Sequence, residues 1–361
     1  MIYGSVLTFA PYAGRYGAKL FVRNMSSSGR HLVYVARSDI PQPGIDLLKK
    51  LVDVKLWNQP SPVPRDEFLK GVVGVNAIFC SISDKIDKTV LDAAGSSLKV
   101  IGTMSVGFDH IDVPECKKRG IKIGYTPNVL TDATAELTLL SSPYCLKTSQ
   151  VALLLSTSRR LPEAMHEART GGWVSWAPSW MTGPGLSGAV VGIVGYGRIG
   201  QAVAQRVKAF NTSKILYFNR SERPEAEKLG AIRVSFDKLL TESDFVICCT
   251  SLVPETKEMF NKAAFEKMKP SAVFINTSRG GIVDQDALVE ALQNNTIWGA
   301  GLDVTTPEPL PLESPLFKLK NCVVLPHIGS ATIQTRNEMS VFTARNILAG
   351  LEGHEMPAEL K

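Results

Sequence analysis

The chain has 361 residues, of which 44% are hydrophobic and 20% are charged. This length accommodates two domains with proper cores, and the composition is that of a soluble globular protein. No run approaches the roughly 18 consecutive apolar residues that indicate a membrane span. The net charge is +6, but residues 1–30 hold four basic residues and no acid, which leaves 36 basic against 34 acidic residues in the body. We therefore expect neither a membrane nor a nucleic-acid partner.

Residues 1–30 resemble a mitochondrial presequence, because they are basic, lack acids and contain three consecutive serines at 26–28. The alternatives are a disordered extension, or sequence upstream of a start at Met25. The six cysteines have neither metal-ligand nor disulfide-framework spacing, so we expect free thiols, no metal site and a reducing compartment. The prediction is a cytoplasmic protein, with a mitochondrial location as the alternative if residues 1–30 act as a presequence.

From residue 31 onward, β-like runs alternate with helical ones. In the first unit, strands are predicted at 31–36, 75–80 and 98–101, with helical patterns over 45–52 and 113–119. The second unit has six predicted strands, at 190–194, 214–218, 245–249, 272–276, 298–303 and 322–325, with a helical pattern at 286–293 among them. Such alternation predicts parallel sheets covered by helices on both faces, and six strands fit a doubly wound sheet. A last helical pattern at 332–351 is expected to return to the first unit.

The predicted fold class is therefore α/β, with two doubly wound parallel-sheet domains. We expect residues 31–130 and 333–361 to form a discontinuous substrate domain, into which a Rossmann coenzyme domain of residues 131–332 is inserted. The sequence between the two units is unusual, because residues 139–150 contain Ser-Ser-Pro-Tyr between helical runs at 134–138 and 151–155, and proline breaks a helix. Without these twelve residues the two runs would join into one apolar helix, so we interpret 139–150 as an insert that bears on dimerisation and domain closure.

The second unit contains a glycine motif, Gly195-x-Gly197-x-x-Gly200, between the apolar strand 190–194 and a helical run at 201–207. One glycine makes the tight turn, one lets the backbone approach a pyrophosphate, and one lets helix pack on strand. The anion then lies on unpaired N–H groups at the positive end of the helix. Because the strand and helix on either side are the context that the motif requires, the stretch predicts dinucleotide binding.

The residues that follow the next strand bear on which dinucleotide binds. An acid about 20 residues past the glycines bonds the ribose hydroxyls of NAD. Here the only nearby acid is Glu222, which lies past the strand end between Arg220 and Arg223. Two arginines suit charge-assisted hydrogen bonds to a 2′-phosphate, so we predict NADPH, with NADH as the weaker cofactor. The alternative is an exposed basic loop with Glu222 as its counter-ion.

Three later motifs place reactive side chains at successive strand ends. Arg279 follows strand 272–276, and His327 follows strand 322–325. Asp303 ends strand 298–303, and Glu308 follows it. Ligands bind at the carboxyl ends of strands in such sheets. Each residue alone has a structural explanation, as a surface ion pair, part of a rigid Pro-Glu-Pro turn, or a structural histidine. Their combination downstream of a dinucleotide motif indicates an active site.

These residue types suit the reduction of a 2-oxo acid, in which a hydride reaches C2 and a proton reaches the carbonyl oxygen. His327 is suited to give that proton near neutral pH, and Glu308 would favour its charged form. Arg279 can orient the substrate carboxylate or polarise the carbonyl.

The Thr-Ser-Arg-Gly, Pro-Glu-Pro and Pro-His-Ile-Gly-Ser-Ala motifs together resemble the D-isomer-specific 2-hydroxyacid dehydrogenase family, and within it the animal branch that reduces glyoxylate and hydroxypyruvate. The resemblance covers residues 31–361 apart from 139–150. It implies a flavodoxin-like substrate domain, a homodimer, and NADPH-dependent conversion of glyoxylate to glycolate and of hydroxypyruvate to D-glycerate. It also implies that Arg279, Glu308 and His327 are the catalytic residues.

The first unit is expected to supply the other wall of the site. The stretch 104–110 follows a predicted strand, and its small residues would let backbone N–H groups face an anion. By resemblance, Val106 and Gly107 hold the substrate carboxylate together with Arg279 and His327, and Ser330 lies beside the substrate; we interpret His110 as structural. The resemblance further places six residues around the cofactor: Arg198, Ile199, Ser251, Thr277, Asp303 and Gly329.

Residues 172–180 contain three of the five tryptophans. Large aromatic side chains dominate contact energies, so this cluster suits a dimer interface. In relatives the stretch forms an arm that crosses to the other subunit, where Trp176 would cap the neighbour's substrate pocket. The alternative is a core cluster within one chain.

Two other functions are compatible with the same fold. One is another 2-hydroxyacid dehydrogenase, such as phosphoglycerate dehydrogenase, although the chain ends soon after Leu351 without room for a regulatory domain. The other is a dinucleotide-sensing transcriptional corepressor, which would bind NADPH but turn over no 2-oxo acid.

Overall fold

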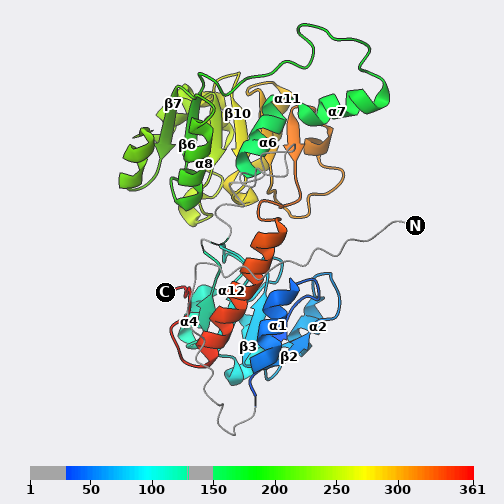
Figure 1. Ribbon diagram of the computed structural model, residues 1–361, viewed down its shortest axis with the longest axis vertical. Coiled ribbons are helices and arrows are strands. Elements are labelled where there is room, and N and C mark those ends of the chain that lie inside the picture. Colours follow the sequence, from blue (N-terminus) through cyan, green and yellow to red (C-terminus); the bar gives the residue numbers. More distant parts are fainter. Residues whose placement is uncertain (1–29, 128, 130–148) are drawn as a thin grey trace, which may run out of the picture. The chain divides into compact units, whose positions relative to one another are not determined.

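The structure, a computed structural model, describes residues 30–127, 129 and 149–361 (Figure 1). The predicted extension of residues 1–30 lies outside the described residues except for Arg30. The helical run at 134–138 and residues 139–148 of the insert also lie outside them. The described part contains two all-parallel sheets, so the predicted α/β class with two parallel-sheet units is confirmed. No helix in these ranges is long and apolar enough to cross a membrane.

The first sheet has the strand order β2-β1-β3-β4-β5, which is the flavodoxin-like order. Its strands are β1 (Leu32–Val35), β2 (Asp53–Leu56), β3 (Ala77–Cys80), β4 (Val100–Thr103) and β5 (Lys122–Gly124). Every residue of β3 and β4 is buried, as expected where helices cover both faces of a parallel sheet.

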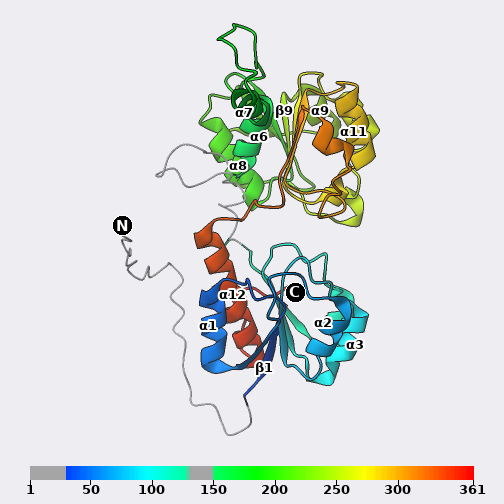
Figure 2. The ribbon, with the colours of Figure 1, turned by 90° about the vertical axis from the view of Figure 1, so that its right-hand side faces the viewer.

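Helices from the two ends of the described chain cover one face of this sheet. Figure 2 shows α1 (Gln42–Leu51) and α12 (Ile333–Leu351) on that face, and α2 (Arg65–Gly71) with α3 (Lys88–Ala94) on the other. The helix predicted at 332–351 thus packs against α1 and β4. A side chain at Gly102 of β4 would bring a Cβ within 2.6 Å of Ile347 Cγ1 on α12, so this close approach requires glycine. A fifth helix, α4 (Val113–Lys118), leads into β5.

The second sheet has the order β12-β11-β10-β9-β6-β7-β8. Its strands are β6 (Val190–Val194), β7 (Lys214–Phe218), β8 (Ala231–Arg233), β9 (Phe245–Cys248), β10 (Val273–Asn276), β11 (Gly299–Leu302) and β12 (Cys322–Val324). This is the Rossmann order with one further strand, β12, beyond the sixth. The direction of winding reverses between β6 and β9, and ligands of such sheets bind at this reversal.

Each face of the second sheet carries its own core. In Figure 2, α6 (Ser149–Ser158) and α8 (Arg198–Lys208) lie on one side of β9, and α9 (Phe236–Glu242) and α11 (Gln285–Gln293) on the other. Buried apolar residues of α6 and α8 pack on the first face, and those of α9, α10 (Lys262–Lys267) and α11 pack on the second. α7 (Leu161–Thr170) follows α6 and buries none of its residues. Short 3₁₀ turns lie at Gly95–Ser97, Pro224–Leu229, Pro254–Thr256, Gly280–Ile282 and Pro315–Lys318.

The prediction of six strands in the second unit is wrong, because the sheet has seven. The missed strand is β8, and β2 and β5 of the first sheet were also missed. All three are edge strands of three or four residues. The twelve-residue insert is only partly described, since α6 begins at Ser149 and includes its last two residues.

Candidate functional site

The turn between β6 and α8 has a backbone that only glycine accommodates. Gly195 has φ +93°, and a Cβ there would lie 2.7 Å from the Cys249 carbonyl carbon and the Thr250 nitrogen. A Cβ on Gly200 would collide with the Gly195 carbonyl oxygen, so helix and turn are in direct backbone contact. At Gly197, by contrast, a Cβ would have nothing within 4 Å among the described residues.

These three environments match what a pyrophosphate requires of such a turn. Gly197 is the N-cap of α8 and provides no side chain to accept the first amides of the helix. The positive end of this eleven-residue helix lies beside the β6–β9 reversal. The residues present fit a nicotinamide dinucleotide.

The predicted arginines lie in the loop after β7. The Arg223 amide donates to the Tyr217 hydroxyl over 3.3 Å, while its guanidinium Nε is buried without an acceptor in the described chain. Arg233 Nη2 donates to the carbonyl oxygens of Asn219 and Arg220, over 3.2 and 2.9 Å, and so holds the loop against β8. The Arg220 and Glu222 residues are exposed.

Arg279 lies in a tight turn after β10 that a buried asparagine organises. Asn276 is fully buried; its Oδ1 accepts the Ser278 amide and its Nδ2 donates to the Arg279 carbonyl, both over 3.0 Å. The Arg279 side chain donates from Nη1 to the Ser278 carbonyl over 2.8 Å and from Nε to Asp109 Oδ1 over 3.0 Å. The Arg279 charge lowers the pKa of Asp109 although burial alone would raise it.

His327 and Glu308 are in direct contact. His327 Nδ1 lies 2.8 Å from Glu308 Oε2, and the Thr305 amide donates to Glu308 Oε1 over 3.0 Å. Burial raises the pKa of Glu308, but the His327 hydrogen bond and charge, the Thr305 amide and the Arg279 charge outweigh it, so the net shift is downward. The carboxylate is therefore ionised at neutral pH and holds the Nδ1 side of the ring. This leaves Nε2 as the nitrogen that can exchange a proton with a substrate.

The loop that carries His327 is fixed by a buried carboxylate. Asp303 is 2% exposed, and its two oxygens accept the amides of Ile328 and Gly329 over 2.8 and 2.7 Å. His327 lies between the end of β12 and these two amides. Its φ is +53°, a left-handed conformation that costs a non-glycine residue about 1–3 kcal/mol. Strain of this kind persists where the surroundings impose it, which is common at active sites.

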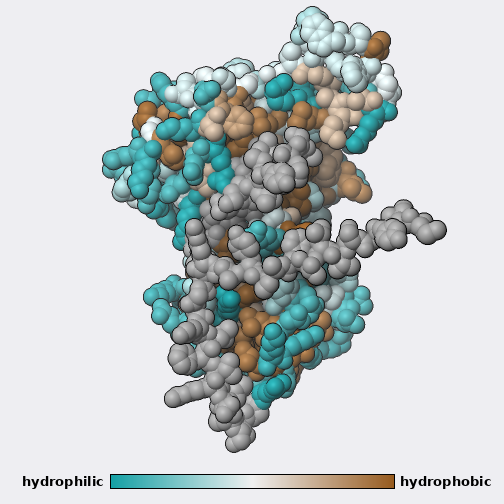
Figure 3. All heavy atoms as spheres, in the orientation of Figure 1, coloured by the Kyte–Doolittle hydropathy of each residue, from teal (hydrophilic) through white to brown (hydrophobic). Residues whose placement is uncertain are grey.

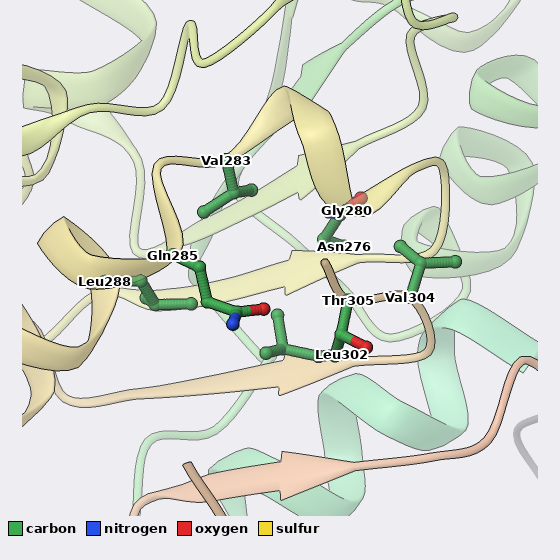
Figure 4. Close-up of a pocket in the computed structure, with 8 residues that line it drawn as sticks. All are labelled: Asn276, Gly280, Val283, Gln285, Leu288, Leu302, Val304 and Thr305. Atoms are coloured by element: carbon green, nitrogen blue, oxygen red, sulfur yellow. The ribbon is translucent and has the colours of Figure 1, made fainter. Parts of the chain in front are cut away.

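The Arg279 turn and the Glu308 segment pack against each other. A Cβ on Gly280 would collide with the Thr305 carbonyl oxygen and approach Thr306 Oγ1 to 2.5 Å. On the far side, Gln285 of α11 accepts the Thr306 amide at its Oε1 over 3.1 Å. Gly280, Gln285, Leu302 and Thr305 are among the residues that line a small cavity here, which Figure 4 shows. The positions of the guanidinium and the carboxylate are thereby coupled through backbone contacts.

Residues 151–329 match the family model described as D-isomer specific 2-hydroxyacid dehydrogenase, NAD binding domain. The chain is 53% identical over 325 residues to the glyoxylate reductase/hydroxypyruvate reductase of Mus musculus, covering 89% of this chain and 95% of that protein. The corresponding protein of Homo sapiens is 52% identical over 332 residues, covering 91% and 97%. The chain belongs to the D-isomer-specific 2-hydroxyacid dehydrogenase family.

A solved structure agrees with this assignment. The NADPH-dependent glyoxylate/hydroxypyruvate reductase of Sinorhizobium meliloti, in complex with NADP and malonate, has a TM-score of 0.76 at 32% identity and covers 92% of this dehydrogenase and 97% of its own chain. The resemblance inferred from the motifs is confirmed, and with it the oxidoreductase class.

The other predicted site residues of this dehydrogenase lie at loops around the two sheets. Val106 and Gly107 follow β4 and are partly buried; in the described chain their N–H groups have no acceptor. Of the residues expected around the cofactor, Arg198 in the first turn of α8 and Ser251 after β9 are exposed. Ile199 packs on the core formed by α6 and α8. Thr277, after β10, and Gly329, whose amide Asp303 accepts, are buried. Ser330 is partly buried beside Gly329.

The tryptophan segment of this dehydrogenase is exposed. Trp173 and Trp176 are 63% and 82% exposed, and Val174 is 91% exposed. The alternative of a core cluster within one chain is therefore wrong. The outer end of the segment after α7 is mostly pale in Figure 3, between the hydrophilic and hydrophobic ends of the scale.

Sequence reasoning missed three residues that hold the Arg279 and Glu308 segments in place. Asn276, Gln285 and Asp109 contact the Arg279 or Glu308 segments, yet none was singled out. Asn276 had a usable signal, since it is a polar residue that ends an apolar run directly before Thr-Ser-Arg-Gly. Gln285 and Asp109 had none, because their importance follows from tertiary contacts.

Proposed function

We propose that this dehydrogenase reduces small 2-oxo acids, glyoxylate to glycolate and hydroxypyruvate to D-glycerate, with NADPH as the preferred cofactor. The observation that carries the proposal is the 2.8 Å contact between His327 Nδ1 and Glu308 Oε2 beside the Arg279 turn. An ionised carboxylate that holds one ring nitrogen leaves the other to act as a general acid. The two curated relatives carry glyoxylate and hydroxypyruvate reductase in their names, which supports these substrates.

Separate groups of residues bind the dinucleotide, transfer the proton and orient the substrate. The turn at Gly195–Gly200 and the loop with Arg220 and Arg223 would hold the dinucleotide, whose reduced ring supplies the hydride when bound. His327 delivers a proton from Nε2 to the carbonyl oxygen, and Glu308 stabilises the imidazolium. Arg279 orients the substrate carboxylate or stabilises charge on the carbonyl oxygen.

A steady-state panel of small 2-oxo acids with NADPH and NADH tests the proposal. We expect turnover of glyoxylate and hydroxypyruvate, with a higher kcat/KM for NADPH. A protein that binds NADPH but turns over no 2-oxo acid would favour the corepressor function instead. Turnover of a different 2-oxo acid alone would favour another dehydrogenase of the family.

Three further assignments belong to the proposal. Residues 31–130 with 333–361 form the substrate domain and residues 131–332 the coenzyme domain, which is supported by the packing of α12 on the first sheet. The protein is a homodimer in which the exposed segment after α7 reaches the partner, with Trp176 near the partner's substrate. The location is cytoplasmic, or mitochondrial if residues 1–30 act as a presequence.

A further inference from the structure

His110 begins a chain of hydrogen bonds that ends on the proposed substrate loop. His110 Nε2 lies 3.0 Å from Thr103 Oγ1, which lies 2.8 Å from Ser105 Oγ, which donates to the Gly107 carbonyl over 2.6 Å. Thr103 is fully buried and Ser105 is 4% exposed. Water therefore has little access to the inner links of the chain.

The direction of this chain follows from its last acceptor. A carbonyl oxygen only accepts, so the Ser105 hydroxyl must give its one proton to Gly107. Ser105 then accepts the proton of Thr103, and Thr103 accepts in turn from His110 Nε2–H. The imidazole is thus fixed as the neutral Nε2–H tautomer, which agrees with a buried Nδ1 that has no partner in the described chain.

The residues that make this series of hydrogen bonds are themselves held by the backbone of the first sheet and its loops. Thr103 is the last residue of β4, in the interior of the first sheet. The His110 carbonyl accepts the Ile86 amide over 2.8 Å, and the Thr126 amide donates to the Ser105 carbonyl over 2.9 Å. Val106 and Gly107 lie between these anchors, and their amides are expected to bind the substrate carboxylate.

We propose that His110 is a positioning residue, which acts through Thr103 and Ser105 to fix the Gly107 peptide and so pre-orients the Val106 and Gly107 amides toward the substrate carboxylate. The inference rests on the proposed substrate role of this loop. Preorganised donors avoid the entropy cost of ordering the loop on each binding event. Loss of this series of hydrogen bonds should therefore weaken substrate binding more than it slows the chemical step.

The test replaces Thr103 by valine, which has nearly the same shape but no hydroxyl. Thr157 provides a matched control, because it is also a buried threonine whose Oγ1 donates a hydrogen bond, to the Leu153 carbonyl within α6 over 2.7 Å. For Thr103→Val we expect the KM for glyoxylate and hydroxypyruvate to rise about tenfold, from the loosening of a charge-assisted contact, with kcat and the Kd for NADPH little changed. Thr157→Val should leave all three values unchanged.

A second pair of variants guards against misfolding at position 103. His110→Gln keeps a donor near the position of Nε2, whereas His110→Phe keeps the volume and removes it. We expect His110→Phe to raise the KM as Thr103→Val does, and His110→Gln to restore much of the loss.

The possible outcomes distinguish a failure of the proposed function from a failure of the role proposed for His110. Absence of turnover in the wild type would overturn the proposed function and this inference together. Wild-type turnover with Thr103→Val behaving like Thr157→Val, or with His110→Phe equal to His110→Gln, would overturn the inference alone.

Discussion

Glu308 and His327 form the pair on which the chemistry depends. Their contact and the downward shift in the pKa of Glu308 keep the carboxylate charged at neutral pH. Replacement of Glu308 by glutamine removes the charge but retains the size. We expect kcat to fall about a hundredfold, within the range that general acid catalysis contributes, while the Kd for NADPH stays the same.

Glu313→Gln is the control for this variant, since Glu313 is an exposed acid in the same connection between β11 and β12. Equal kcat values for the two variants, measured at saturating substrate, would show that Glu308 has no special role.

His110 should make the stability of the protein depend on pH. Burial lowers the pKa of His110 from 6.5 to about 4; the Arg279 charge adds to this shift and the Asp109 charge opposes it. Between these two values the unfolded chain binds a proton that the folded chain excludes. The free energy of unfolding therefore decreases as the pH falls from 6.5 toward 4, by about 2 kcal/mol at pH 5 from this group.

Urea unfolding of wild type and His110→Gln at pH 7.5 and pH 5 measures this contribution. The variant should lose less stability than the wild type on acidification. His354→Gln, which removes an exposed histidine, should follow the wild type. Parallel losses in all three proteins would contradict the assignment.

The site residues were predictable only where a local motif marks them. Arg279, Glu308 and His327 each follow an apolar strand and carry glycine or proline neighbours, which is visible in the sequence. Gln285 and Asp303 act through backbone amides of distant segments, and only the folded chain reveals these contacts. Asp303 in particular was predicted at the cofactor, and its two carboxylate oxygens hold the His327 loop.

At the scale of elements, the interior strands were predictable, whereas of the four edge strands in the described part of the chain only β12 was predicted. β3, β4, β9 and β10 are buried along their whole length and read as continuous apolar runs. β2 alternates exposed and partly buried residues, and β8 has two exposed residues of three. A short strand with one neighbour and a polar side cannot be told from a loop by periodicity.

The loop after β7 is the element that should select the cofactor. Arg223 has a buried, unpartnered Nε in the described chain, and Arg233 holds the loop backbone in place. In the double variant Arg220→Ala, Arg223→Ala we expect kcat/KM for NADPH to fall about ten- to hundredfold, because charge-assisted bonds to the 2′-phosphate are lost. The value for NADH should stay near that of the wild type.

Lys228→Ala is the control, since it removes one exposed positive charge from the 3₁₀ turn that follows the loop. An equal decrease for both cofactors in the double variant would argue against recognition of the 2′-phosphate.

At the scale of the whole molecule, the exposed segment after α7 bears on assembly. Two tryptophans and a valine within 173–176 are more than half exposed, and large exposed aromatics are typical of interfaces. Replacement of Trp173 and Trp176 by alanine should shift the protein from dimer to monomer in sedimentation experiments. A wild-type protein that is monomeric at micromolar concentration, or a variant that stays dimeric, would contradict the proposed arm.

The proposed reaction depends on His327 as the proton donor, and His327→Ala tests this role most directly. The measurement is kcat for glyoxylate reduction beside the Kd for NADPH, with His354→Ala as the control. The account predicts that kcat falls at least about a hundredfold while NADPH binding and the urea midpoint stay close to the wild type. Near-wild-type kcat in His327→Ala would contradict it.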